Sequence, residues 1–372
     1  MIRGWAPAVA LVLSLLAGAV ASARDIDCPA RNEPYGSRTV MLDLMLDPAA
    51  RAVIERLAPS IAKPPFGDKE WMLEPPTFAA ILTPASLLRS RTDAAALDAA
   101  LDAELGRIAL TPAVRAARCA RYDAAPPALP ARVPRPALLV FGKINGFRDV
   151  PSVTAANRAV AGIAAARGWT LVATDNGAVF NARNLARFDA VLWNNVSGDV
   201  LTLSQRAAFR RWIERGGGYA GMHGSGGDPV TPWAWYAETL IGARFIGHPM
   251  TPQFQSARVR VEDPANPITA GLGTEWTMTE EWYSFDRSPR RDGSRVLLTL
   301  DESSYAPIGL GKENLAMGDH PIAWTRCVGR GRSFYSAIGH RPENYEEPHS
   351  RAVLERGLAW AMDGTQPGGC PR

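Results

Sequence analysis

Residues 190–223 read AVLWNNVSGDVLTLSQRAAFRRWIERGGGYAGMH, and this stretch decides the fold class. It begins with one short apolar run, AVLWNNV, and closes with another, YAGMH. Between them, residues 202–215 have the apolar spacing of an amphipathic helix and lead into three glycines, which are typical after the last turn of a helix. Since parallel strands need a crossover connection, a strand, a helix and a second strand in this order predict a parallel pair.

The chain on either side repeats this pattern. Residues 137–142 (ALLVFG) and 169–175 (WTLVATD) are apolar runs, separated by a predicted helix at 152–168. Further strands are expected at 257–263, 295–301, 321–326 and 331–340. Apolar strands that alternate with helices indicate a sheet with both faces covered. Residues 137–363 are therefore expected to form an α/β domain with a doubly wound, mostly parallel sheet of the flavodoxin-like kind, followed by a tail at 364–372.

The region before this domain has a different pattern. Residues 24–123 are expected to be mainly helical, with Leu97, Leu101 and Leu105 four residues apart on one helix face. Because this region carries no chemical motif, we expect a helical packing or interaction module that could bind a protein partner. Residues 124–136 contain five prolines, which stiffen the chain and exclude a regular helix, so we expect a linker there.

The first 23 residues have the pattern of a secretory signal peptide. Arg3 precedes an apolar run over residues 6–20, and residues 21–23 (ASA) form a cleavage pattern. The alternative is an uncleaved anchor, but the run contains Pro7 and falls short of the roughly 20 residues that span a bilayer. We expect residues 1–23 to be removed and the product to be periplasmic or secreted, without stable membrane insertion.

Cysteine usage agrees with export. The four cysteines, Cys28, Cys119, Cys327 and Cys370, are an even number, and four cysteines allow three pairings. Because two lie toward each end of the chain, we expect the disulfides Cys28–Cys119 and Cys327–Cys370.

The composition is that of a globular protein, with 47% hydrophobic and 21% charged residues. The net charge is +4, and basic residues are interspersed with acidic ones rather than gathered in blocks. Neither nucleic acid nor an anionic membrane surface is therefore an expected partner.

Polar and glycine-rich segments follow the predicted strands. In an open α/β sheet, ligands bind outside the carboxyl ends of the strands, near the point where the strand order reverses. The residues at these ends that we expect to bind substrate are Lys143, Asn145 and Arg148 after the first strand, and Asn195 and Asp199 after the third. His223 follows the fourth strand and His340 the last, so both are expected at the same edge.

Seven strings in this domain occur in the order found in a known family. They are GKINGFR, NNVSGDVL, GGGYAGMHG, WAWYAETLIGARF followed by HP, EEWYSF, DHPIAW and AIGHRPENY. In these strings the chain resembles the ThuA-like (trehalose-utilisation) family over residues 137–363. The family is similar in fold to the class I glutamine amidotransferases, so the resemblance implies that fold and a small-molecule saccharide as the substrate.

The chain departs from these relatives at positions that bear on activity. Amidotransferases carry a nucleophilic cysteine at the sharp strand-to-helix turn, where this chain has His223, so glutamine hydrolysis is not expected. Members of the ThuA-like family commonly have a histidine after the GFR string, where this chain has Asp149, an acid that can still bind a metal or accept a proton. His340 and Glu343 resemble the histidine and glutamate of the amidotransferase triad.

Histidines and acids are available for a metal site. Imidazole is the commonest ligand for zinc, and a catalytic zinc site has about three protein ligands and one open position. The expected metal ligands are His223, His248 and His320, with Glu280, Glu281 and Asp319 as carboxylates that could complete the set. Because the spacing is non-local, a structural, hydrogen-bonded role is the alternative for each histidine.

Two further features concern the substrate and the nucleophile. Trp235 and Tyr283 lie in aromatic-rich strings and could stack on a sugar ring, although core packing is the alternative. Ser225 could act as a nucleophile with His340 as base and Glu343 as its orienting carboxylate. A serine at that distance from the turn is more often a helix cap.

These observations predict an exported enzyme that acts on a saccharide or a keto-sugar by hydrolysis, elimination or isomerisation, with or without a divalent metal such as zinc. The expected catalytic residues are His223, His340, Glu281 and Glu343. In this reading a metal or His223 polarises a carbonyl or activates water, and His340 or Glu281 moves a proton. The alternative is a non-catalytic carbohydrate-binding or scaffolding protein with a degenerate amidotransferase-like site.

Overall fold

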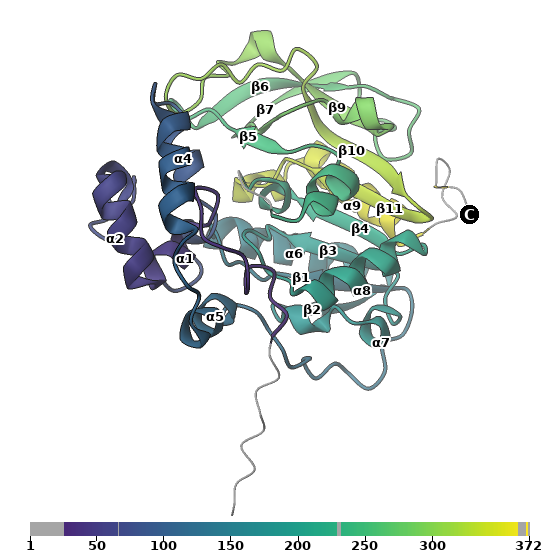
Figure 1. The fold of residues 1–372 in the computed structure, drawn as a ribbon. Coiled ribbons are helices and arrows are strands. Elements are labelled where there is room, and N and C mark those ends of the chain that lie inside the picture. Colours follow the sequence, from purple (N-terminus) through teal and green to yellow (C-terminus); the bar gives the residue numbers. More distant parts are fainter. Residues whose placement is uncertain (1–25, 66, 229–231, 364–369, 371–372) are drawn as a thin grey trace, which may run out of the picture.

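The computed structural model describes residues 26–65, 67–228, 232–363 and 370. The predicted signal peptide, residues 1–23, lies outside this part of the chain, as does most of the predicted tail. Within the described part, no helix is long and apolar enough to cross a membrane. The main feature is a nine-stranded sheet in the order β2-β1-β3-β4-β11-β10-β9-β6-β7 (Figure 1).

Five strands form the parallel half of this sheet. They are β2 (Thr170–Thr174), β1 (Ala137–Phe141), β3 (Ala190–Asn194), β4 (Gly218–Met222) and β11 (Gly331–Ser336). All residues of the last four are buried, which explains their continuous apolar runs.

Helices cover both faces of the parallel half. The helix α6 (Val150–Arg167) joins β1 to β2, and α8 (Leu203–Glu214) joins β3 to β4 in the opposite direction across the sheet. Since such crossovers are right-handed, the two helices lie on opposite faces. The short helix α7 (Ala182–Leu185) packs on α8, and α9 (Pro348–Met362) packs on α6, β4 and β11. The predicted α/β class is confirmed.

The other half of the sheet is antiparallel, so the sheet is mixed rather than mostly parallel. It consists of β10 (Pro321–Val328), β9 (Arg295–Asp301), β6 (Phe254–Val261) and β7 (Glu275–Glu281). Because direction alternates from β11 outward, β7 runs the same way as β4 and ends at the same edge. Two short strands, β5 (Phe245–Gly247) and β8 (Ser284–Phe285), form a separate antiparallel pair.

The sequence predicted β6, β9, β10 and β11 but not β7. The strand β7 reads EWTMTEE, and its first residues alternate between exposed and buried positions. Such half-exposed alternation is usual at the edge of a sheet, and here it lacks the apolar run that marked the other strands. This omission matters because β7 ends on Glu281.

Residues 26–123 pack against the carboxyl edge of the sheet. Their helices are α1 (Met41–Leu46), α2 (Pro48–Leu57), α3 (Pro84–Leu88), α4 (Ala94–Leu105) and α5 (Pro112–Cys119). Figure 1 shows α1, α2 and α4 in purple and blue beside the sheet. The backbone N–H of Thr77 donates to Asn145 O at 3.0 Å, and Phe78 stacks on Phe147 with 5.1 Å between ring centroids. This N-terminal region therefore contacts the loop that follows β1.

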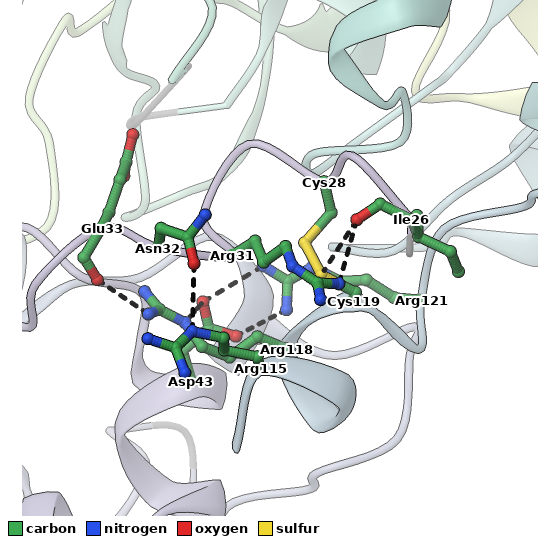
Figure 2. Close-up of a disulfide and its surroundings, with 10 residues drawn as sticks. All are labelled: Ile26, Cys28, Arg31, Asn32, Glu33, Asp43, Arg115, Arg118, Cys119 and Arg121. Atoms are coloured by element: carbon green, nitrogen blue, oxygen red, sulfur yellow. Dashed lines mark hydrogen bonds and ion pairs between the residues drawn. A yellow bond between two sulfur atoms is a disulfide. The ribbon is translucent and has the colours of Figure 1, made fainter. Parts of the chain in front are cut away.

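Two disulfides connect distant parts of the chain. Cys28 is bonded to Cys119 and Cys327 to Cys370, so both predicted pairings are confirmed. The first closes a loop across the N-terminal region, and Figure 2 shows it next to a group of charged side chains.

Those charged side chains surround one buried acid. Asp43 on α1 lies 3.4 Å from Arg118 Nε and 2.6 Å from Arg121 Nη1, and all three side chains are buried (Figure 2). Breaking a buried ion pair by removing one partner is costly because it leaves an uncompensated charge. Charge thus joins α1 to the end of α5, and the disulfide attaches the segment before α1 to the last residue of α5.

Loss of each disulfide should destabilise the protein to a different extent. The cysteines of the two bridges are separated by 91 and 43 residues. Loop-closure entropy then gives about 4.7 kcal/mol for Cys28–Cys119 and about 4 kcal/mol for Cys327–Cys370. We expect both double Cys→Ala variants to unfold at lower urea concentration, the Cys28/Cys119 variant at the lowest. A Cys28/Cys119 variant as stable as the wild type would contradict this expectation.

Candidate functional site

The turn after β4 presents His223 to the carboxyl edge of the sheet. Its φ is 36°, a left-handed conformation that non-glycine residues adopt at a cost and that is common at functional turns. Its Nδ1 lies 2.7 Å from the carbonyl oxygen of Ala337, which can only accept, so Nδ1 carries the proton. The Tyr283 ring stacks on the imidazole at 4.1 Å. The Nε2 atom is therefore left to face the interior of the site.

Glu281, at the end of β7, joins three histidines. Its Oε2 lies 3.2 Å from His223 Nε2 and 2.9 Å from His340 Nδ1, and its Oε1 lies 3.3 Å from His248 Nδ1. Burial by itself would raise the pKa of Glu281, but its close interactions with His223 and His340 outweigh burial and hold it well below its usual range. Glu281 is therefore an anion at every physiological pH.

His340 lies in the loop after β11. Burial alone would lower its pKa, but the hydrogen bond to Glu281 and the negative charges of Glu280 and Asp149 raise it. Its Nε2 lies 3.6 Å from Asp149 Oδ2, while the other oxygen of Asp149 caps the start of α6. The raised pKa of His340 and the lowered pKa of Glu281 describe one ion pair, in which the carboxylate stabilises the imidazolium and the imidazolium stabilises the carboxylate.

Glu280, the neighbour of Glu281, holds the loop that carries His340. It is fully buried, and its Oε2 accepts hydrogen bonds from Gly339 N at 2.9 Å and Asn344 Nδ2 at 2.8 Å. Its Oε1 accepts from Arg341 N at 3.3 Å. Residues on both sides of His340 are thus attached to the same strand that supplies Glu281.

The cluster of His223, Glu281 and His340 has the dimensions of a metal site. Tetrahedral bonds of about 2.05 Å place ligand atoms about 3.3 Å apart. The separations of the three donor atoms here are 3.2, 3.2 and 2.9 Å. The carbonyl of Ala337 holds His223 in the tautomer whose Nε2 can coordinate. This buried cluster could therefore hold a metal ion.

The cluster opens onto a cavity of about 750 Å³. Polar groups from the strand ends and their loops line one part of it, namely Asp149, Asn195, His223, Asp228, His248, Gln253, Glu281 and His340. The N-terminal region and the loops at 245–254 and 309–315 line the remainder. Cavities of this size hold ligands of more than one ring.

Of the predicted substrate-binding residues, the structure brings two, Asn195 and Tyr283, to the cavity wall. Lys143 pairs with Asp123 at 2.6 Å, and Asp199 pairs with Arg206 at 2.6 Å. Both pairs hold loops together outside the cavity lining, so a substrate role for Lys143 and Asp199 is replaced by a structural one.

The other three lie outside the lining as well. Asn145 is buried and donates to Asp199 O at 2.6 Å, whereas Arg148 is exposed to solvent. Trp235 packs beside Trp233, with ring centroids 5.1 Å apart, in a π-helical turn at Trp235–Ile241. Asn145 and Arg148 follow β1 as expected, but none of the three side chains lines the cavity.

Of the three predicted metal ligands, His223 alone belongs to the cluster of His223, Glu281 and His340. His223 and His248 both contact Glu281, although through different carboxylate oxygens. His320 lies elsewhere, with Nδ1 2.7 Å from Glu302 Oε1 and Nε2 2.9 Å from Tyr283 O. Both ring nitrogens of His320 are used in the fold, so His340 replaces it in the cluster.

Two proposed partners of His340 are corrected. Glu343 is exposed and accepts from Arg341 Nε at 3.4 Å, and the carboxylate that orients His340 is Glu281. Ser225 is buried and donates from Oγ to Trp193 O at 2.8 Å, so its hydroxyl is used to join β3 to the turn after β4. Geometry therefore does not favour a serine nucleophile.

Sequence reasoning missed several cavity residues. Gln253 donates to Glu281 Oε1, and the Phe254 ring lies edge-on to His340 at 5.1 Å. Burial raises the pKa of Asp228 to about 6, against hydrogen bonds from Ser197 Oγ and Gly198 N that lower it. Asp228 comes soon after His223 in a glycine-rich segment, a sequence signal that could have identified it.

Comparison with known proteins gives a family for residues 137–361, which match the model described as ThuA, trehalose utilisation. A solved ThuA-like protein from Bacteroides uniformis is 25% identical, with a TM-score of 0.54, over 66% of this chain and 98% of its own. Another, from Parabacteroides merdae, is 13% identical, with a TM-score of 0.45, over 63% and 91%. No curated protein sequence matches significantly.

Replacing Glu281 by Gln should lower the pKa of His340. The substitution removes the charge that holds the imidazolium, while burial, which lowers the pKa, remains. NMR titration of the histidine ring protons in chelator-treated protein measures this shift. The Glu343→Gln variant removes an exposed acid in the same loop and should leave the titration unchanged.

The same substitution has a consequence for stability. The pKa of His340 is higher in the folded protein than in the unfolded chain, where it is about 6.5. Its contribution to stability is therefore fully present below about pH 6.5 and is lost as pH rises through the pKa of the folded state. The lowered pKa of Glu281 contributes stability that is present above its unfolded value of about 4.5 and is lost as pH falls further. The difference in Tm between wild type and Glu281→Gln should therefore be largest between about pH 4.5 and 6.5 and should narrow as pH rises through the folded pKa of His340. A difference that widens with pH above about 6.5 would contradict the assigned ion pair.

Proposed function

The chain belongs to the ThuA family, described by trehalose utilisation, and on this premise we propose that it is an enzyme that cleaves a saccharide or keto-sugar from its leaving group. The single observation that carries the proposal is a buried carboxylate between two histidines at the base of a large cavity. Strongly perturbed pKa values in a cleft are typical of reactive sites. The family description supports a saccharide as the substrate, and the geometry of the buried cluster supports a catalytic reaction at this site.

We propose that His223, Glu281 and His340 hold a divalent ion such as zinc. The distances fit one ion, and the negative field that raises the pKa of His340 also favours a metal cation. When bound, such an ion supplies Lewis-acid polarisation of a carbonyl or of water. Glu281 then serves as a charged ligand rather than as a base, because its lowered pKa makes it a poor proton acceptor.

Asp228 is the group best suited to move a proton in the cavity. Its pKa of about 6 lets the carboxyl both hold and release a proton near neutral pH. It lies next to Gly227, where an added Cβ would come within 2.5 Å of the Tyr283 ring that stacks on His223. Asp149 and Gln253 border the cluster and provide hydrogen-bonding groups for sugar hydroxyls.

Two buried histidines provide a matched test of this proposal. His223→Ala should abolish metal binding and lower kcat/KM by about a hundredfold or more, since it removes a group at the reacting centre. His320→Ala should keep specific activity and metal content but lose about 1–3 kcal/mol of stability, because Glu302 and Tyr283 O lose their partner. Elemental analysis, thermal melts and turnover of glycosides and 3-keto-glycosides measure the three effects.

The outcomes separate the alternatives. A His223→Ala variant that melts much lower but keeps its specific activity would contradict the assigned site. Tight binding of a saccharide without turnover by the wild-type protein would instead make it a sugar receptor. Turnover that survives complete metal removal would be compatible with the assigned catalytic residues but would refute the proposal that they hold a metal ion.

A further inference from the structure

One side of the cavity is built by the N-terminal region and is apolar. The residues that this region contributes include Pro65, Phe78, Ile81, Leu82 and Leu87. Facing them, loops of the α/β domain contribute Phe147, Ile246, Met250, Phe254 and Leu310. Of the eight large hydrophobic side chains that are exposed in the described part of the chain, four belong to this lining: Phe147, Ile246, Phe254 and Leu310. Exposed apolar surface gathered in a concave site marks a binding surface.

The boundary between the polar and apolar parts lies at His340. The Phe254 and Phe147 rings lie 5.1 and 6.0 Å from its imidazole. Phe147 is in turn stacked on Phe78, with an angle of 26° between the ring planes. Phe147 and Phe78 therefore form a stacked pair that leads from His340 toward the N-terminal region.

This apolar wall provides few partners for hydroxyl groups. The polar residues that the N-terminal region adds to the lining are Ser86, Arg89 and Ser90. Arg89 is paired with Glu313, which also lines the cavity, at 2.8 Å, and Ser86 Oγ donates to Thr83 O at 2.8 Å. A second sugar ring placed there would leave hydroxyls without hydrogen bonds, which is costly for polar groups removed from water. A flat apolar group would instead bury its surface against Phe78, Ile81 and Leu87.

We propose that this wall is a subsite for an apolar or aromatic leaving group, so that the substrate is a glycoside of an apolar alcohol or phenol rather than a disaccharide. The inference rests on the proposed function, since the sugar is placed at His223, Glu281 and His340. Half of the ten apolar residues named for this wall lie before the family match, which starts at residue 137. The N-terminal region thereby selects the leaving group.

A pair of ligands that differ only in this group tests the subsite. Calorimetry with the full-length wild-type protein compares phenyl and methyl β-D-glucosides, together with their 3-keto forms. Burial of one phenyl ring should tighten binding by on the order of tenfold or more. Trehalose should bind no better than the methyl glycoside. Equal affinity for the phenyl and methyl ligands would overturn the inference.

Variants assign the effect to the wall. Phe78→Ala and Leu87→Ala should each reduce the phenyl-to-methyl affinity ratio several-fold and leave the affinity for the methyl ligand unchanged. Leu203→Ala, an exposed leucine outside the cavity lining, is the matched control and should keep the ratio. Thermal melts show whether each variant is folded. Because there are two variants, the test still works if one of them fails to fold. A ratio unchanged in both folded variants would refute the subsite.

Turnover distinguishes this inference from the proposed function. Suppose that neither ligand is cleaved, that the phenyl ligand binds more tightly than the methyl ligand, and that the variants lose this preference. The subsite is then supported and the enzymatic proposal fails. If both ligands are cleaved with equal kcat/KM and bind equally, the enzyme stands and the subsite fails.

Discussion

Glu281 lies buried between His223 and His340, and its carboxylate is the point at which three distant parts of the chain meet. One histidine follows β4, the other follows β11, and the glutamate ends β7, which lies beyond β10, β9 and β6 in the sheet. A buried carboxylate is tolerated when charged or hydrogen-bonding partners compensate for its lost hydration. The antiparallel half of the sheet and the parallel half are therefore coupled by one side chain, and the geometry of the candidate site depends on both being folded.

Much of the fold was predictable because it follows from local pattern. Fully buried strands read as apolar runs, and glycines and caps marked the ends of helices, so the parallel half was predicted along with His223 and His340 at one edge. The partners were not predictable, because they depend on which strands pair. Glu281 was a candidate among several acids. Glu343 was preferred as the orienting carboxylate because it resembles the glutamate of the amidotransferase triad, and His320 rather than His340 was expected as a metal ligand. Strand order and direction distinguish them, and neither can be read from spacing.

The N-terminal region illustrates a second limit. Its segments rich in proline indicated irregular structure, and its helices indicated packing, but nothing local showed which surface it would cover. In the folded protein, Phe78 and Leu87 line the same cavity as Phe147 and Phe254, and this position suggests their role. A region without a chemical motif can thus shape a site whose reactive groups all come from elsewhere. Its attachment by the Cys28–Cys119 disulfide and the Asp43 ion cluster keeps that wall in position.

Two consecutive glutamates end β7, and they perform different tasks: Glu280 holds the loop around His340, while Glu281 contacts the imidazoles. Successive residues of a strand point to opposite sides. A slip of β7 against β6 by one position would leave a glutamate at only one of the two places and bring Thr279 or Trp282 to the other, so at least one task would fail. Insertions or deletions in the connection at 262–274 are therefore tolerable where the loop absorbs them and the pairing of β7 with β6 stays in register. The doubled glutamate makes this edge strand, the part of a sheet most prone to misalignment, sensitive to its own register.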